Sequence, residues 1–137
     1  MAHTKFPVEL LTPEGKVFDE EVEMVSTRTT VGLIGVLAHM SPVLAMLEPT
    51  ELRIYRSDDD IVRYAQSEGY MQVANNRVLL LVGEVHKPED LDVGQLRDRL
   101  SEADRELDSA GDDSEKQRLA RRDKDRWEAF LRVAEGN

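Results

Sequence analysis

The chain has 137 residues, of which 40% are hydrophobic and 34% are charged, and its formal net charge at pH 7 is −10. This length accommodates one domain with a modest core, or a small domain with an appendage. The acidic balance argues against direct nucleic-acid binding, because phosphates bind basic surfaces. Cysteine is absent and the three histidines are scattered, so we expect no disulfide and no metal site.

The hydropathy pattern indicates a soluble, cytoplasmic protein. The longest uninterrupted apolar runs, such as Val78 to Val82, are far shorter than the ~20 residues that span a bilayer. Residues 1–7 contain no apolar core of a signal peptide. We therefore expect no direct insertion into a membrane.

Residues 1–87 have the pattern of a β-domain. Apolar and polar residues alternate over short segments, which are separated by turn residues such as Pro13-Glu14-Gly15 and Asn75-Asn76. The alternation is expected to place Val22, Met24 and Ser26 on one face, opposite Glu21, Glu23 and Val25. Val78 to Val82 is apolar at every position, which predicts a central strand buried on both faces. About nine or ten such strands predict a β-sandwich or flattened barrel.

Two glycines three residues apart interrupt the apolar segment from Thr30 to Leu44. Gly32 and Gly35 permit a positive φ or the close approach of another backbone, so we predict two short strands on either side of a corner near His39. A phosphate loop is disfavoured because no Lys-Ser/Thr pair follows and no helix begins here.

Two other groups could carry chemistry, and both have a simpler interpretation. His39 near Ser41 lacks an acid spaced to orient a catalytic histidine, so we interpret it as a loop residue. Asp58-Asp59-Asp60 lacks the alternating ligands and closing glutamate of a calcium loop, so we interpret it as a solvated hairpin tip.

The pattern changes at Pro88, after which half of the residues are charged. Asp92 is placed to cap a helix, and Gly111 to end it. The first helix has an apolar stripe of Leu96, Leu100, Ala103 and Leu107. A second helix is predicted from about 114 to 134, with a stripe of Ala120, Trp127, Phe130 or Leu131, and Ala134. The predicted fold is α+β, with a β-domain over 1–87 and an antiparallel two-helix hairpin over 88–137.

The predicted hairpin has too few apolar residues to stand alone. Each stripe offers four or five side chains worth about 1.5–3 kcal/mol when buried, whereas ordering the backbone costs about 1–2 kcal/mol per residue. The hairpin must therefore lie against the β-domain or a partner, as a mobile appendage. Its basic cluster is either a solvated face with ion pairs such as Lys124–Glu128, or a patch that docks on an acidic partner. The cluster consists of Arg118, Arg121, Arg122, Lys124 and Arg126.

The sequence resembles the ε subunit of bacterial F-type ATP synthase along nearly its whole length. The resemblance rests on residues 12–15 (TPEG), 32–37 (GLIGVL), 42–44 (PVL), 68–73 (EGYMQV) and 75–78 (NNRV), followed by Leu91-Asp92 and the hairpin. It implies a ten-stranded β-sandwich followed by two helices, in a non-catalytic central-stalk (rotor) subunit at the cytoplasmic face of the cell membrane. It also implies that the subunit couples γ to the c-ring, with the α and β subunits as further partners. The hairpin is then either a conformational brake on ATP hydrolysis or a structural strut. We expect no cofactor.

The corner departs from the family's pattern. Leu33 replaces the usual acidic residue, and His39 stands one position early, before Met40 and Ser41. We expect these four residues on the c-ring side, with apolar contact in place of charge.

The family's nucleotide signature, Ile/Leu-Asp-x-x-Arg-Ala, is also altered. It keeps Leu91-Asp92 but has Gln95 and Leu96 in place of arginine and alanine. A carboxamide cannot supply the charge-assisted fork that arginine offers a phosphate, so we expect no tight ATP binding.

An alternative function is a stand-alone β-sandwich binding module with a helical dimerisation tail. Such a module needs an aromatic-lined groove, and the β-domain has only Phe6, Phe18, Tyr55, Tyr64 and Tyr70. Co-purification with ATP synthase subunits distinguishes the two functions.

Overall fold

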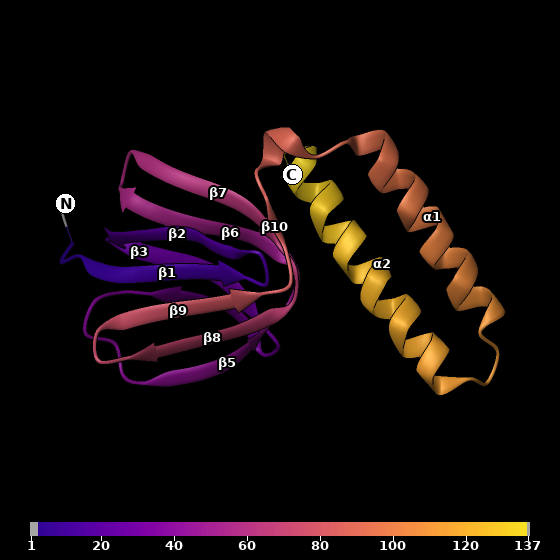
Figure 1. The fold of residues 1–137 in the computed structure, drawn as a ribbon, viewed down its shortest axis with the longest axis horizontal. Coiled ribbons are helices and arrows are strands. Elements are labelled where there is room, and N and C mark those ends of the chain that lie inside the picture. Colours follow the sequence, from indigo (N-terminus) through magenta and orange to yellow (C-terminus); the bar gives the residue numbers. More distant parts are fainter. Residues whose placement is uncertain (1–2, 137) are drawn as a thin grey trace.

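The computed structural model describes residues 3–136, in which ten strands precede two helices (Figure 1). The first five strands are β1 (Phe6–Thr12), β2 (Gly15–Val22), β3 (Met24–Thr29), β4 (Gly32–Val36) and β5 (Val43–Leu47). The others are β6 (Thr50–Ser57), β7 (Asp60–Gln66), β8 (Gly69–Ala74), β9 (Arg77–Val82) and β10 (Val85–His86). A short 3-10 turn (Pro88–Asp90) leads to α1 (Val93–Ser109) and α2 (Ser114–Ala134). The predicted α+β fold is confirmed.

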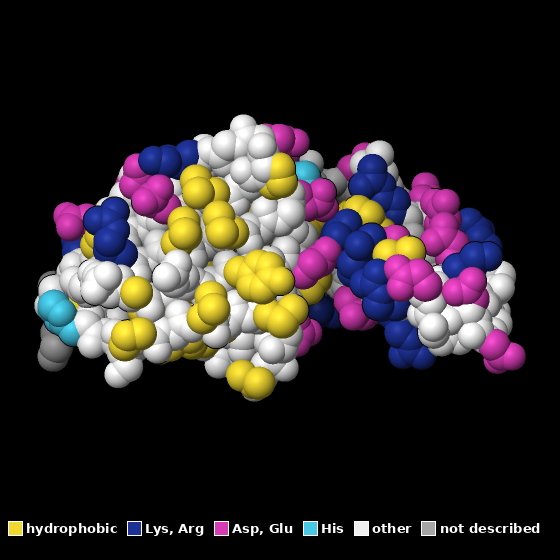
Figure 2. Space-filling model, turned by 60° about the horizontal axis from the view of Figure 1, so that its bottom comes forward, with side chains coloured by type: hydrophobic (Ala, Val, Ile, Leu, Met, Phe, Trp, Pro, Cys, Tyr) yellow, Lys and Arg dark blue, Asp and Glu magenta, His cyan; other side chains and the backbone are white. Residues whose placement is uncertain are grey.

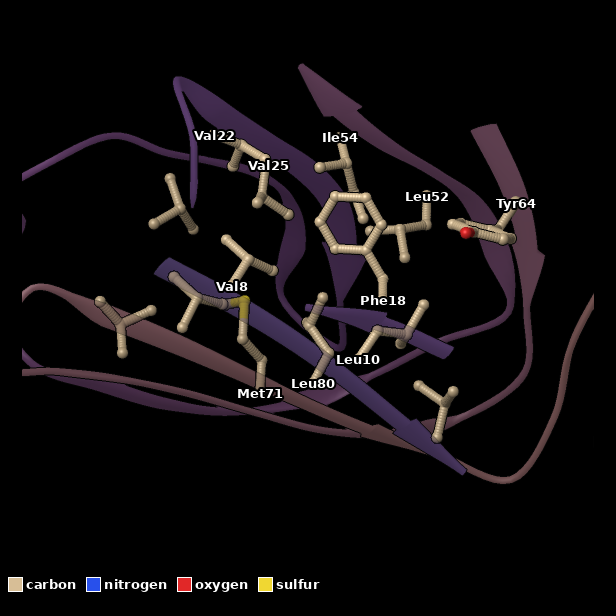
Figure 3. Packing of buried hydrophobic residues seen from close by; sticks show 14 of the residues in the cluster. Val8, Leu10, Phe18, Val22, Val25, Leu52, Ile54, Tyr64, Met71 and Leu80 are labelled. Carbon is tan, nitrogen blue, oxygen red and sulfur yellow. The ribbon is translucent and has the colours of Figure 1, made fainter. Parts of the chain in front are cut away.

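The strands form one sheet that folds back on itself. Its order is β10-β7-β6-β3-β5-β8-β9-β1-β2, with β4 paired to the other side of β3. β3 belongs to both halves of the sheet. Its residue Ser26 pairs with Arg53 of β6 in one half, and its residue Thr29 pairs with Leu47 of β5 in the other. The two halves enclose a sandwich-like core (Figure 3). Its largest fully buried apolar side chains are Phe6, Leu10, Leu52, Ile54, Met71 and Leu80.

The turns use the residues that the sequence indicates. Asn75 and Asn76 have φ angles of 53° and 59°, which is the left-handed geometry of a two-residue hairpin turn. Gly32 has a φ of 127°, whereas at Gly35 a Cβ atom would lie 2.9 Å from the Met24 methyl carbon. Gly32 therefore has the predicted positive φ, whereas the close neighbour of Gly35 is the end of a flexible side chain and not another backbone.

Two strand predictions are wrong in part. Val22 and Glu23 are both buried, so the alternation shifts by one residue, and Val25 rather than Met24 faces the core. The shift occurs because the chain bends between β2 and β3, where the Glu23 N–H donates to the Tyr55 carbonyl at 2.8 Å. β9 is central in the sheet, but Leu81 is 43% exposed, because only one face of this half is covered.

The helices begin and end as predicted. Asp92 accepts a hydrogen bond from the Gln95 N–H at 3.1 Å, and Gly111 adopts a φ of 58° after α1. Within α2, Ala120 and Phe130 are buried as expected, whereas Trp127, Leu131 and Ala134 are only half-buried. The predicted stripe omitted Ala129 and Val133, which are buried because the last turns of α2 contact the sandwich as well as α1.

Candidate functional site: an apolar face and a docked hairpin

Apolar side chains gather on the outer surface of β5, β8 and β9 (Figure 2). Leu44 is 78% exposed, Met46 56%, Tyr70 54% and Leu81 43%. The half-buried Leu11 and Leu79 continue this surface on β1 and β9. We call these six residues the apolar face.

The strand register explains why these residues lie together. Met46 pairs with Tyr70, Tyr70 with Leu81, and Leu81 with Leu11, so one row of apolar side chains crosses four strands. A second row links Leu44 to Leu79 through Gln72. Paired residues on adjacent strands point to the same side of a sheet. The rows therefore form a continuous surface on a rigid support.

A surface of this kind is suited to binding a protein partner. Monomeric proteins rarely expose large contiguous apolar patches, and such patches commonly mark interaction sites. None of the six side chains is charged, although the chain contains 28 acidic and 18 basic residues. The sequence predicted the apolar character of β9 but not its exposure. The signal was available in β5, where Leu44 and Met46 alternate with inward-facing residues.

The structure separates the residues that the sequence assigned to the c-ring side. Leu33 lies near the start of β4 and is 72% exposed. His39 and Ser41 are exposed in the loop that follows the other end of β4. A strand advances about 3.3 Å per residue, so Leu33 lies some 10 Å before the end of this strand. Met40 is half-buried and packs against the core.

The loop that contains His39 is fixed to the β8–β9 turn. His39 has a left-handed φ of 63°, and its backbone N–H donates to the Asn76 side-chain oxygen at 2.7 Å. This hydrogen bond holds the corner near His39, which follows Gly32 and Gly35, in one position.

The second feature is the junction between α2 and the sandwich. Ala129, Phe130 and Val133 of α2 form a buried cluster with Leu96 of α1 and Ala65 of β7. The Phe130 ring contacts His86 edge-on, with 5.6 Å between the ring centroids. The docked hairpin thus agrees with the expectation that it cannot stand alone.

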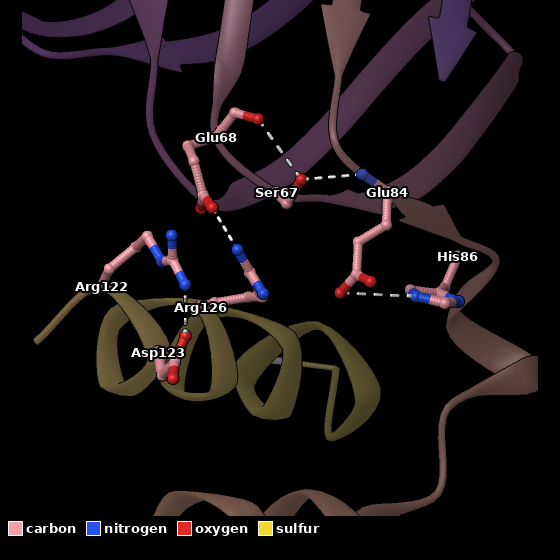
Figure 4. Close-up of polar contacts among 7 residues, drawn as sticks. All are labelled: Ser67, Glu68, Glu84, His86, Arg122, Asp123 and Arg126. Carbon is pink, nitrogen blue, oxygen red and sulfur yellow. Dashed lines mark hydrogen bonds and ion pairs between the residues drawn. The ribbon is translucent and has the colours of Figure 1, made fainter. Parts of the chain in front are cut away.

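The predicted basic cluster is divided by the same junction (Figure 4). Arg126 faces the sandwich and forms an ion pair with Glu68, whereas Arg118, Arg121 and Arg122 are exposed. Arg118 pairs with Glu115 at 2.6 Å, and its hydrogen bond lowers the pKa of the Glu115 carboxyl.

Lys124 pairs differently from the prediction. Its ammonium nitrogen lies 3.0 Å from a carboxylate oxygen of Asp104 on α1. The hydrogen bond to Asp104 is the main cause of the raised pKa of Lys124, and Glu128 contributes only a weaker attraction. The side chain therefore ties the two helices together.

The altered nucleotide signature lies at the start of α1. Gln95 is exposed, and Leu96 is 5% exposed within the junction cluster. Leu96 therefore packs against α2 and the sandwich. The absence of tight ATP binding stays a prediction.

Other chemistry finds little support between residues 3 and 136. In this range no group of three His, Cys, Asp or Glu side chains is placed to hold a metal ion. Asp58–Asp60 lies at the β6–β7 hairpin turn. Across the same residues, no helix is long and apolar enough to cross a membrane.

An open apolar face on a β-sandwich, with a helical hairpin docked at one end, is the arrangement expected of a protein-binding subunit. Residues 5–88 match the family model described as ATP synthase, Delta/Epsilon chain, beta-sandwich domain. The chain belongs to this family, and the expected resemblance to an ε subunit is confirmed.

The relatives cover most of the chain. The ATP synthase epsilon chain of Priestia megaterium is 35% identical over 107 residues, which cover 77% of this chain and 78% of the relative. That of Sulfurihydrogenibium sp. is 27% identical over 129 residues, covering 94% and 96%. That of Rubrobacter xylanophilus is 36% identical over 98 residues, covering 72% and 66%.

Solved structures share the fold. A chain of the Euglena gracilis mitochondrial ATP synthase, in a structure of OSCP, F1 and c-ring, aligns with a TM-score of 0.81 at 21% identity, covering 95% of this chain and 81% of that one. A chain of the Tetrahymena thermophila mitochondrial ATP synthase, in a structure of central stalk and c-ring, aligns with a TM-score of 0.64 at 15% identity, covering 98% and 99%.

Proposed function

We propose that the chain is a central-stalk (rotor) subunit of a proton-translocating F-type ATP synthase and couples the γ subunit to the c-ring. It contributes no catalytic residues of its own and lies peripherally at the cytoplasmic face of the cell membrane. Membership of the ATP synthase Delta/Epsilon family supports this role. The observation that carries it is the apolar face, because a subunit that transmits torque needs a lasting interface, and lasting interfaces are more hydrophobic than transient ones.

The apolar face is the surface that we assign to the γ subunit. It spans four hydrogen-bonded strands of one sheet half, so its side chains are held in fixed positions, as a permanent contact requires. At its edge, the Thr30 N–H donates to the Met46 carbonyl at 3.0 Å. This contact brings the exposed apolar tip, with Val31 95% and Leu33 72% exposed, next to the face.

We assign this tip to the c-ring side, together with His39 and Ser41 as a separate contact. Met40 does not contact the c-ring in this proposal; its side chain packs against the core and supports the loop. The tip and the loop lie at different ends of β4, so they are two separate contact surfaces.

Substitution on the apolar face tests the assignment to γ. Tyr70→Asp places a carboxylate at the centre of the first row, and burying an unpaired charge is costly. We expect the variant to bind the γ subunit at least about tenfold more weakly in a pull-down titration, which corresponds to ~1.4 kcal/mol. Thermal unfolding of the free subunit should change little, because Tyr70 is 54% exposed.

A matched control is Arg63→Gln, which makes the same change in net charge on the exposed outer side of β7. Its affinity for γ should equal that of the unsubstituted chain. Equal binding by the Tyr70→Asp variant would remove the apolar face from the γ interface.

The helical hairpin has a second role in this proposal. Residues 88–137 form a unit separate from the sandwich unit of residues 1–87. The hairpin restrains ATP hydrolysis when it leaves the sandwich, and its exposed arginines then dock on an acidic surface of the α and β subunits. The mainly polar surface of α2 and its small buried contact with the sandwich support a reversible docking.

A further inference from the structure

We propose that Arg126 and Glu68 form a releasable latch that holds the hairpin on the sandwich. This inference rests on the proposed hairpin role and adds the contact that controls it. Docking uses Arg126 for the sandwich, whereas the three other arginines of the basic cluster remain exposed. When the hairpin leaves the sandwich, Arg126 becomes exposed together with the other arginines of the basic cluster, and Phe130 loses its cover.

The latch joins segments that are far apart in the sequence. Glu68 lies in the connection before β8, and its carboxylate accepts a hydrogen bond from the Arg126 guanidinium across 58 residues of chain. The Arg126 side chain is 18% exposed and that of Glu68 is 35% exposed, so water screens the pair only in part. The guanidinium also lies over the Trp127 ring, 5.6 Å from its centroid. A second ring contact comes from Arg99 of α1, at 4.9 Å from the same ring.

Several other charged or titratable groups surround the latch. On the sandwich side, Glu84 points toward α2, and its carboxylate lies 3.8 Å from the His86 ring (Figure 4). On α2, Arg122 is paired with Asp123 at 3.4 Å. The sandwich therefore presents two carboxylates to Arg126, and only one of them is bonded to it.

The polar part of this contact is incompletely satisfied. Three buried atoms have no hydrogen-bond partner among residues 3–136: Glu68 Oε2, Glu84 Oε1 and Arg126 Nε. A buried polar atom without a partner destabilises the state that buries it, whereas release returns the atom to water. The ion pair favours docking and the unsatisfied atoms oppose it. The docked state is therefore held specifically but weakly, as a latch requires.

The absence of cysteine provides a direct test in the full-length chain. Val133→Cys places a single thiol in the junction, at a position that is 5% exposed. This thiol is shielded from 5,5′-dithiobis(2-nitrobenzoic acid) while the hairpin is docked, and it becomes fully accessible when the hairpin leaves the sandwich. In that background, Arg126→Gln and Glu68→Gln should each increase the labelling rate about tenfold. The double substitution should also increase it about tenfold, because both single changes remove the same interaction.

The control is Arg118→Gln, which breaks the exposed Arg118–Glu115 pair on the same helix and should leave the labelling rate unchanged. Circular dichroism should show equal helix content in all variants. Single-variant rates within twofold of the background, or a hundredfold increase in the double variant, would refute the latch. The free subunit is used throughout, so the result is independent of whether the hairpin restrains ATP hydrolysis.

Discussion

At the scale of single residues, Arg56 joins the two halves of the sheet across their open side. Its guanidinium donates two hydrogen bonds of 2.9 Å to the Glu20 carboxylate, from β6 to the edge strand β2. It also lies over the Phe18 ring, 5.7 Å from the centroid. The hydrogen bonds hold the pKa of the Glu20 carboxyl below its usual range. Glu20 and Arg56 thus close the sandwich where β2 and β6 do not pair.

This contact predicts a specific response to acid. A carboxyl group whose pKa is lowered by folding stabilises the protein above its unfolded pKa, and this stabilisation is lost as the pH falls through the folded pKa. The side chains are 39% and 45% exposed, so we expect a contribution below about 1 kcal/mol. An NMR titration of the Glu20 side chain should give a pKa below that of a model peptide, and Arg56→Gln should raise it. An identical Glu20 pKa in the two proteins would contradict this account.

Residues whose chemistry is local were predictable from the sequence. Asn75-Asn76, Gly32 and the Asp92 cap satisfy requirements that arise within a few residues of chain. The pairing of Arg126 with Glu68 was not predictable, because the partner is supplied by tertiary packing. The same holds for Lys124, for which helical spacing indicates Glu128 but the neighbouring helix offers Asp104.

At the scale of the elements, the two helices differ in what they contact. α2 packs on both α1 and the sandwich, whereas α1 reaches the junction mainly through Leu96. The number and approximate bounds of the helices follow from periodicity and capping. The buried stripe of α2 does not, because a helix with two packing partners buries residues beyond a single stripe.

β9 shows a related limit among the strands. A continuous apolar run indicates burial on both faces, and periodicity alone cannot distinguish burial in the fold from burial in an assembly. Leu81 is exposed in the free chain, yet its row with Tyr70 and Met46 has the composition of an interior.

Removal of the helical elements tests the proposed brake. Truncation after Lys87 deletes α1 and α2 and leaves all ten strands. Because the apolar face is retained, the truncated chain should assemble into the ATP synthase, and ATP hydrolysis by the complex should rise several-fold. Hydrolysis and assembly should be measured on the same preparation, with the full-length chain as control. Unchanged hydrolysis in a fully assembled complex would exclude the brake for this protein.

At the scale of the whole molecule, charge and apolar surface are segregated. The chain carries a net charge of −10, whereas the apolar face carries no charged side chain. The charges keep a free subunit soluble, and the face is left for a partner. A stand-alone binding module would need an aromatic-lined groove of its own, and an open apolar face does not have this form. It fits a family whose members are named as chains of ATP synthase.

The most direct test of this account is to identify what covers the apolar face in the assembled enzyme. A photoreactive benzoyl-phenylalanine is placed at position 70, and irradiated ATP synthase is analysed by mass spectrometry. We predict an adduct with the γ subunit, and no γ adduct when the same group is placed at position 63. An adduct of position 70 with another subunit, or a γ adduct from position 63 alone, would contradict the account.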